Sequence, residues 1–393
     1  MYTTQQSMRW FGPSDAIRLD DLKAAGVSGV VTALHEIPVG EVWSIKAIQE
    51  RQEYIDSFGL RWNVVESLPV SEAIKQRRGD FERHIVNYKT SLENLAQCGI
   101  YTVTYNFMPV LDWVRTDHRF ENSDGTLALA YDHIAFVFFD VHLLQRPGAK
   151  LSYTEDELQA ARAYGERLSD EEQNELFKNA LLGLPGSKGH FTAKQILELL
   201  ADYAHIDEHQ LRKNLICFLE EIIPVAKSCN VQMAIHPDDP PFSVLGLPRV
   251  VRNYDDLKQI FEAVPDQANG LCYCTGSLGA DPETDLIQVL ETFKERIHFL
   301  HLRNIKRYDA KLFQESAHLD GDHPMAAIMQ GVLSIMQQRK INLPLRPDHG
   351  FLFRSEWNSE SYPGYSYIGR LKALAELRGL ELGLCYSKSD QLG

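Results

Sequence analysis

The chain has 393 residues and a mass of 44.8 kDa, and 44% of its residues are hydrophobic. This is the composition of a globular protein, and it excludes disordered, collagen-like and coiled-coil chains. The chain carries 40 Lys and Arg against 54 Asp and Glu, a net charge of −14 at pH 7. Nucleic acids and anionic membranes bind clustered basic residues, so we expect neither as a partner.

Targeting signals and cysteine content indicate where the protein works. No run of 18 apolar residues occurs, and the N-terminal MYTTQQSMRWFGPSD lacks the pattern of a signal peptide. Six cysteines in 393 residues are too sparse for a disulfide scaffold. We therefore expect a cytoplasmic protein whose thiols are mostly free.

Eight short runs rich in Val, Ile and aromatic residues predict β-strands, and most are apolar throughout, as in parallel strands covered on both faces. They span residues 29–34, 60–66, 100–106, 231–236, 270–274, 296–303, 341–347 and 380–384. Helical periodicity predicts an early helix over 15–26 and then helices over 43–59, 80–99, 207–229, 254–264, 283–294, 325–340 and 364–379.

Strands alternating with helices predict an α/β fold, a (β/α)8 TIM barrel, in a single domain spanning 1–393. A doubly wound sheet is the alternative, but no strand is followed by a G-x-G-x-x-G motif. About a hundred residues, 107–206, separate the third and fourth strands, and their charged helical stretches predict a helical insertion on the catalytic face.

The carboxyl ends of the strands form the active-site rim in barrels of this type. Four consecutive strands end near His236, Cys274, His301 and Asp348, which could together bind one divalent cation. Each alone is more simply a buried core or rim residue, but burying all four without a cation would be costly. Imidazole and thiolate favour Fe²⁺ or Zn²⁺ and a carboxylate admits Mn²⁺, so these residues leave the ion open.

Two residues are candidates for proton transfer. His349 follows Asp348 directly, and its ordinary pKa near neutrality suits a general acid or base. The alternative for His349 is an orienting role beside the metal ligand. Tyr365 opens the last predicted helix and could reach the rim as a proton donor, although a packed tyrosine fits the spacing equally well.

Candidate substrate-binding residues also lie at the strand ends. Arg303 and Arg346, with Arg115 from the insertion, could hold an anionic substrate by charge-assisted hydrogen bonds, although each could equally form a structural ion pair. The polar strand-end and loop residues are His35, Glu66, Asn106 and Asp320. For Asp320, within His318–Asp322, a turn that caps the next helix is the alternative.

These strand-end motifs resemble the mannonate dehydratase family of the hexuronate pathway. The most specific matches are HPDDPP, CTGS and RPDHG, and others, including RWFGPSD, YNFMPVLDWVRTD, HLRN, AHLDGD and PGYSYIGR, extend the resemblance from about residue 9 to 384. The resemblance implies a xylose-isomerase-like barrel and the dehydration of D-mannonate to 2-dehydro-3-deoxy-D-gluconate in glucuronate catabolism. It also implies Mn²⁺ or Fe²⁺ bound by His236, Cys274, His301 and Asp348, and proton transfer by His349 and Tyr365.

Two rival functions remain open. One is a metal-dependent sugar isomerase or epimerase on the same barrel, whose product would keep the mass of its substrate. The other is a non-catalytic sugar-acid binding protein. A zinc phosphodiesterase acting on DNA is disfavoured by the charge of −14. We also expect a homo-oligomer, taken as a dimer, although no residue pattern sets that number.

Overall fold

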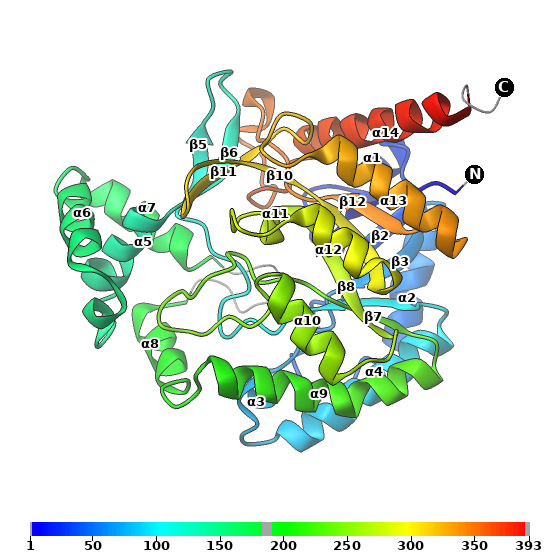
Figure 1. Cartoon of the computed structure of the whole chain (residues 1–393), viewed down its shortest axis with the longest axis horizontal. Helices are drawn as coiled ribbons and strands as arrows, with labels where there is room; N and C mark the ends of the chain where they lie inside the picture. The colour runs from blue at the N-terminus through cyan, green and yellow to red at the C-terminus, as the bar shows by residue number, and fades with distance from the viewer. Residues whose placement is uncertain (1, 183–190, 390–393) are drawn as a thin grey trace.

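The computed structural model describes residues 2–182 and 191–389, and eight strands within them close into a parallel barrel (Figure 1). In chain order these strands are β1 (Gln5–Arg9), β2 (Gly29–Thr32), β3 (Arg61–Glu66), β4 (Thr102–Tyr105), β7 (Gln232–Ile235), β8 (Asn269–Cys274), β9 (Ile297–Leu302) and β12 (Pro344–Pro347). Around the barrel the order is β1, β12, β9, β8, β7, β4, β3 and β2. The predicted (β/α)8 architecture is confirmed.

One predicted strand is wrong and one barrel strand escaped prediction. Residues 380–384 continue α14 (Tyr367–Ser389) as helix, because Leu374, Leu377 and Glu381 are buried at helical spacing. Glu381 also accepts hydrogen bonds from the backbone and side chain of Thr4, which ties this helix to the N-terminus. The barrel strand that was not predicted is β1, whose polar sequence QQSMR lacks the apolar run expected of a buried strand.

The helices cover the outside of the barrel and follow the predicted segments with small shifts at their ends. Side-chain caps fix several helix starts: Ser44 precedes α2 (Ile45–Asp56), Asp207 precedes α9 (Glu208–Ser228) and Asn253 precedes α10 (Tyr254–Ala263). The other helices are α1 (Leu19–Ala24), α3 (Glu72–Gln76), α4 (Phe81–Gln97), α5 (His133–Phe138), α6 (Glu155–Gly165), α7 (Asp170–Ala180), α8 (Ala193–Ala201), α11 (Thr275–Leu278), α12 (Leu286–Thr292) and α13 (Met325–Arg339).

The segment 107–206 contains two strands, β5 (Asp117–Glu121) and β6 (Leu127–Asp132), in addition to α5, α6, α7 and α8. In Figure 1, α5, α6 and α7 form a lobe beside the barrel. The two strands join a hairpin that follows β9, made of β10 (Asn304–Asp309) and β11 (Leu312–Ser316). Together they form a four-stranded antiparallel sheet in the order β10, β11, β6, β5, with Phe313 opposite Tyr131.

A small apolar cluster fills part of the barrel interior. It consists of buried side chains from five strands: Val31, Val64, Ala234, Cys272 and Phe299. Side chains two apart on a strand point to the same face, so the next inward positions lie at the rim. For β3, β7, β8 and β9 these positions are Glu66, His236, Cys274 and His301, and the apolar cluster is therefore the floor of the site.

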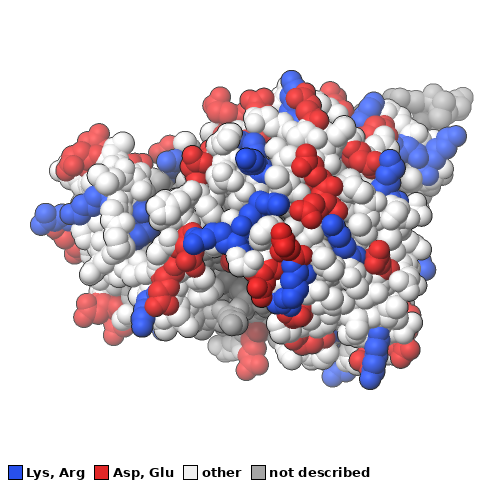
Figure 2. Space-filling view, turned by 90° about the horizontal axis from the view of Figure 1, so that it is seen from below, with Lys and Arg blue, Asp and Glu red and all other residues white. Residues whose placement is uncertain are grey.

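The exterior agrees with an acidic globular protein. On the face shown in Figure 2, Lys and Arg are interspersed with Asp and Glu and do not gather into a stripe. No helix in the described part of the chain is long and apolar enough to cross a membrane.

Candidate active site

Three of the four predicted metal ligands converge at the rim. The candidate ligand atoms of His236, Cys274 and His301 all lie within 4.8 Å of one another. Cys274 and His301 are fully buried, whereas His236 is partly exposed. These are the soft thiolate and imidazole donors that transition-metal ions prefer.

The charge states of His236 and Cys274 depend on each other. Burial alone would raise the pKa of Cys274, but His236, His301 and Arg303 lower it to about 5. Burial would also lower the pKa of His236, but Cys274 raises it to about 9. The Nδ1 atom of His236 lies 2.7 Å from the carbonyl oxygen of Pro237, which directs the Nε2 atom toward the rim.

Asp348 lies at the edge of this group. Its Oδ2 atom is 3.9 Å from the sulfur of Cys274, and the two carboxylate oxygens accept hydrogen bonds from Arg346 at 2.6 Å and Arg303 at 3.2 Å. Burial would raise its pKa, but His349, Arg346, Arg303 and His301 hold the pKa well below the usual range. Asp348 is therefore a carboxylate, and it is shared between the two arginines and the metal-binding group.

Glu66 joins the opposite side of the group. Its carboxylate accepts two hydrogen bonds from Arg346, at 2.7 and 2.8 Å, and also pairs with Arg9. The Oε2 atom lies 3.3 Å from Nε2 of His301, a buried nitrogen that has no hydrogen bond of good geometry. Burial would raise the pKa of Glu66, but Arg346 and Arg9 keep it well below the usual range.

The two predicted proton carriers lie side by side. His349 and Tyr365 are both buried, and their rings meet edge to face with centroids 5.3 Å apart. The backbone N–H of Gly350 donates to the carbonyl of Gly364 at 2.8 Å, which joins the two loops that carry them. Burial raises the pKa of Tyr365 to about 12. Its phenol therefore stays protonated at neutral pH.

Further buried charged residues, from the antiparallel sheet and the loop before it, contact His349 and Arg303. Glu315 on β11 lies 2.9 Å from Nδ1 of His349 and pairs with Arg303 and Arg115. Arg115 also donates two hydrogen bonds to Asp239, at 2.8 and 3.0 Å, and Arg303 donates a third at 2.8 Å. Every one of these side chains is nearly inaccessible to solvent.

The remaining predicted substrate-binding residues occupy different surroundings. His35 and Asn106 are partly buried at the rim, and burial with the nearby Arg9 and Arg51 lowers the pKa of His35 to about 3. Asp320 is exposed in the turn after β11, and its carboxylate has no ion pair or hydrogen bond to a described rim residue. The structure therefore does not bring Asp320 to the metal-binding group.

A glycine makes room for one of the arginines. Gly276 is the second residue of α11, two positions after Cys274, and an added Cβ would lie 1.8 Å from Nε of Arg303. The hydroxyl of Thr275 fixes the same arginine, because it donates to the backbone carbonyl of Arg303 and accepts from its N–H. The consecutive residues Cys274, Thr275 and Gly276 thus place a thiol, a hydroxyl and the space for the Arg303 side chain next to the end of β9.

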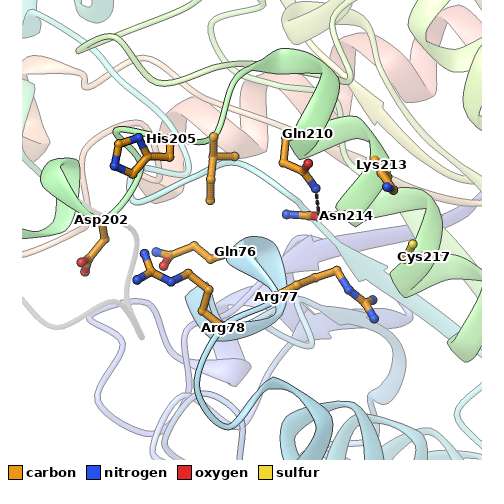
Figure 3. Close-up of a pocket in the computed structure, with 10 residues that line it drawn as sticks. Gln76, Arg77, Arg78, Asp202, His205, Gln210, Lys213, Asn214 and Cys217 are labelled. Atoms are coloured by element: carbon orange, nitrogen blue, oxygen red, sulfur yellow. Dashed lines mark hydrogen bonds between the residues drawn. The ribbon is translucent and has the colours of Figure 1, made fainter.

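Cavities also lie outside this group. One of about 490 Å³ opens between α3 and α9 and is lined by polar residues that include Gln76, Arg78, His205 and Gln210, but by none of the predicted site residues (Figure 3). Another of about 220 Å³ adjoins the loops of His349 and Tyr365, where Gly350, Tyr362 and Gly364 line it.

Sequence reasoning missed several members of the rim. Arg9 lies in the quoted RWFGPSD motif but on a strand that was not predicted, and Asp239 lies in HPDD without an assigned role. Glu315 had no assigned role either, because the hairpin of β10 and β11 was not predicted. The sequence LFQES of β11 has two apolar residues followed by three polar ones, so it lacks the alternation that would have predicted the strand.

Comparison with known proteins identifies the family. The model of the D-mannonate dehydratase (UxuA) family matches residues 4–391. A mannonate dehydratase of Marinomonas sp. (strain MWYL1) is 47% identical over 386 residues, covering 97% of this chain and 99% of the relative. That of Chromohalobacter salexigens is 48% identical over 385 residues, covering 97% and 98%.

Solved structures agree. The crystal structure of mannonate dehydratase from Streptococcus suis serotype 2 superimposes with a TM-score of 0.78 at 30% identity, covering 99% of this chain and 95% of that one. A xylose isomerase-like TIM barrel protein from Mycobacterium smegmatis, in complex with magnesium, superimposes with a TM-score of 0.51 at 12% identity over 97% and 98% of the chains, and shows the fold alone. The chain therefore belongs to the D-mannonate dehydratase family, which confirms the resemblance of its strand-end motifs and makes it an enzyme of the hydro-lyase class.

Proposed function

We propose that the protein converts D-mannonate to 2-dehydro-3-deoxy-D-gluconate and water, as a step of hexuronate catabolism in the cytoplasm. The observation that carries the proposal is the convergence of His236, Cys274 and His301 beside Asp348, in a chain of the dehydratase family. These four residues would bind one Mn²⁺ or Fe²⁺ ion. The chain's charge of −14 does not oppose an anionic substrate, because the rim itself contains buried arginines.

The donor atoms fit such an ion. The Nε2 atom of His301 is buried without a hydrogen-bond partner, and the contact of His236 with the Pro237 carbonyl leaves its own Nε2 atom for a ligand. The low pKa of Cys274 supplies a thiolate at neutral pH. When bound, the cation would stabilise the negative charge that develops as the substrate loses its C2 proton.

The residues of the chain would then move two protons. The C2–H bond breaks and its electrons form the C2–C3 double bond while the C3 hydroxyl leaves. One residue takes the C2 proton and another protonates the departing hydroxyl, giving water and an enol that becomes the 2-keto acid. His349 and Tyr365 lie together beside Asp348 and would divide these two roles.

The two arginines differ in what they could offer the substrate. Arg346 directs all three of its nitrogens to described partners, chiefly Glu66 and Asp348, and would mainly orient those carboxylates. Arg303 keeps a buried Nη2 atom without a hydrogen-bond partner, so it is the better candidate for the substrate carboxylate.

The remaining predicted contacts concern hydroxyl groups and assembly. His35 keeps a buried Nε2 atom without a hydrogen-bond partner and, with Asn106, would bind substrate hydroxyls. Asp320 would reach the substrate only if its loop moved inward. The segment 107–206 would wall the catalytic face, because its strand β6 pairs with β11, the strand that carries Glu315. The homodimer expected from the sequence stays a prediction.

A coupled assay tests the function. Protein stripped of metal is incubated with D-mannonate, Mn²⁺ or Fe²⁺ is added, and a 2-keto-3-deoxy acid is measured. We expect product only after the ion is added, with a mass lower than the substrate by one water. A product of unchanged mass would indicate an isomerase or epimerase, and binding without any product would indicate a sugar-acid binding protein. Either result would refute the proposal.

A further inference from the structure

We propose that Glu315 is a positioning residue for the dehydration, which holds His349 in the tautomer and orientation that make it the base. The inference rests on the proposed function and deepens it, because it divides the two proton transfers between named residues. Glu315 lies on β11, outside the barrel, and only 3% of its surface is exposed. Its Oε1 atom is 2.9 Å from Nδ1 of His349.

The chemistry of this contact selects a tautomer. An ionised carboxylate only accepts hydrogen bonds, so Nδ1 of His349 must carry the proton in the pair. The Nε2 atom of a neutral imidazole is then unprotonated and has a lone pair available. The charges of Arg303 and Arg115, together with the hydrogen bond from His349, outweigh burial and lower the pKa of Glu315, which keeps it ionised.

The contact is held from both sides. Arg115 lies 3.2 Å from Oε1 of Glu315, and Arg303 lies 3.3 Å from Oε2, so the carboxylate cannot rotate freely. The ring of His349 packs against Trp113 and Tyr365, with centroids 5.6 and 5.3 Å away. Because the residues that contact His349 are themselves fixed, His349 has its catalytic orientation before the substrate binds.

The roles of the proton carriers follow. Nε2 of His349 takes the C2 proton, and the electrons of the C2–H bond form the C2–C3 double bond. The C3–O bond breaks, and the phenol of Tyr365 gives its proton to the departing hydroxyl, which leaves as water. The enol then returns its O–H proton to the phenolate while C3 takes the proton from His349, which restores both residues.

The substitution Glu315→Gln tests the inference because it keeps the shape and removes the charge. We expect kcat to fall by about 100-fold or more, with KM changed by less than about threefold and the bound metal unchanged. Asp256→Asn is the matched control, because Asp256 is a buried carboxylate of α10 whose side chain pairs with Arg212 and Arg252 and with no described residue of the rim. It should lower the melting temperature and leave kcat intact.

A double-mutant cycle shows which partner Glu315 acts through. In a His349→Asn background, Glu315→Gln should cost little further turnover, because the residue it positions is gone. If the loss of kcat in the double variant equalled the product of the losses in the two single variants, Glu315 would act through Arg303 or Arg115. That result would overturn the inference. An unchanged kcat in the single Glu315→Gln variant would also overturn it.

Nitrogen NMR of [15N]histidine-labelled protein gives an answer that does not depend on turnover. The resonances of His349, assigned by their loss in His349→Asn, should show Nδ1–H in the wild type and a changed tautomer balance in Glu315→Gln. Nε2–H in the wild type, or no change in the variant, would refute the inference. If the wild type forms no 2-keto-3-deoxy acid, the proposed function fails, while this spectrum still tests the role of Glu315.

Discussion

The substitution Gly276→Ala tests the tight contact between the start of α11 and Arg303. The added Cβ would lie 1.8 Å from Nε and 2.5 Å from Cζ of Arg303, whereas real Cβ contacts are seldom closer than about 3.4 Å. The guanidinium must therefore move by more than about 1 Å. Its hydrogen bonds to Asp239, at 2.8 Å, and to Asp348, at 3.2 Å, would break.

The loss of unfolding free energy in Gly276→Ala has two parts, the overpacking and the broken ion pairs of Arg303. Overpacking a buried site costs about 1–3 kcal/mol, and breaking a buried ion pair costs about 3–5 kcal/mol. Together they imply at least about 4 kcal/mol. At about 2.1 cal/mol/K per residue, the unfolding entropy of 393 residues is about 0.8 kcal/mol/K, so the melting temperature should fall by about 5 °C.

Thermal unfolding and turnover of the same preparation give the measurement, with Gly379→Ala as the matched control. Gly379 lies in α14 with nothing within 4 Å of an added Cβ, so alanine there should stabilise the helix by about 0.5–1 kcal/mol. Gly276→Ala should also lose turnover, because Asp348 loses one of its two arginines. If Gly276→Ala had the melting temperature and the turnover of the wild type, the close contact between Gly276 and Arg303 would be refuted.

Three further predictions concern the ligands, the proton donor and the response to acid. Cys274→Ser should lower the Mn²⁺ retained after dialysis by about tenfold or more, measured by mass spectrometry of the metal, and retention near the wild-type amount would exclude Cys274 as a ligand. Tyr365→Phe should lower kcat by about 10²- to 10⁴-fold, and because the pKa of Tyr365 is raised to about 12, a limb in the wild-type pH profile below about pH 10 that vanishes in this variant would contradict its role as a neutral donor. Burial lowers the pKa of His298 from 6.5 to about 4, so its contribution to stability is present above pH 6.5 and is lost as the pH falls toward 4. Between pH 7 and pH 5 that loss is about 2 kcal/mol, and urea unfolding of His298→Gln should show a smaller loss than the wild type, whereas an equal loss would contradict the assignment.

Most of the barrel could be predicted because buried parallel strands need apolar side chains on both faces. Seven of the eight predicted strand segments overlap barrel strands for this reason. Strand β1 could not be found this way, since Met8 is its only apolar residue and its last residue, Arg9, pairs with Glu66 of the charged rim. The predicted strand over 380–384 failed because a leucine-rich run of five residues fits a helix face equally well.

The candidate site was predictable as far as residues at strand ends were concerned. His236, Cys274 and His301 meet as expected, because equivalent positions of neighbouring parallel strands lie at one edge. What could not be predicted was the pairing among charges. The contact between Glu315 and His349 depends on a hairpin outside the barrel. The hydrogen bonds from Arg346 to Glu66 join residues 280 positions apart in the sequence.

The four-stranded sheet links two parts of the chain that lie far apart in the sequence. Phe313 on β11 pairs with Tyr131 on β6, across 182 residues and three barrel strands. The position of Glu315 depends on the pairing of β6 with β11. Moving one of the two hairpins to another barrel would therefore not reproduce the site. The two hairpins form a single structural unit, so a larger or smaller side chain at the pairing of β6 with β11 would shift the carboxylate of Glu315.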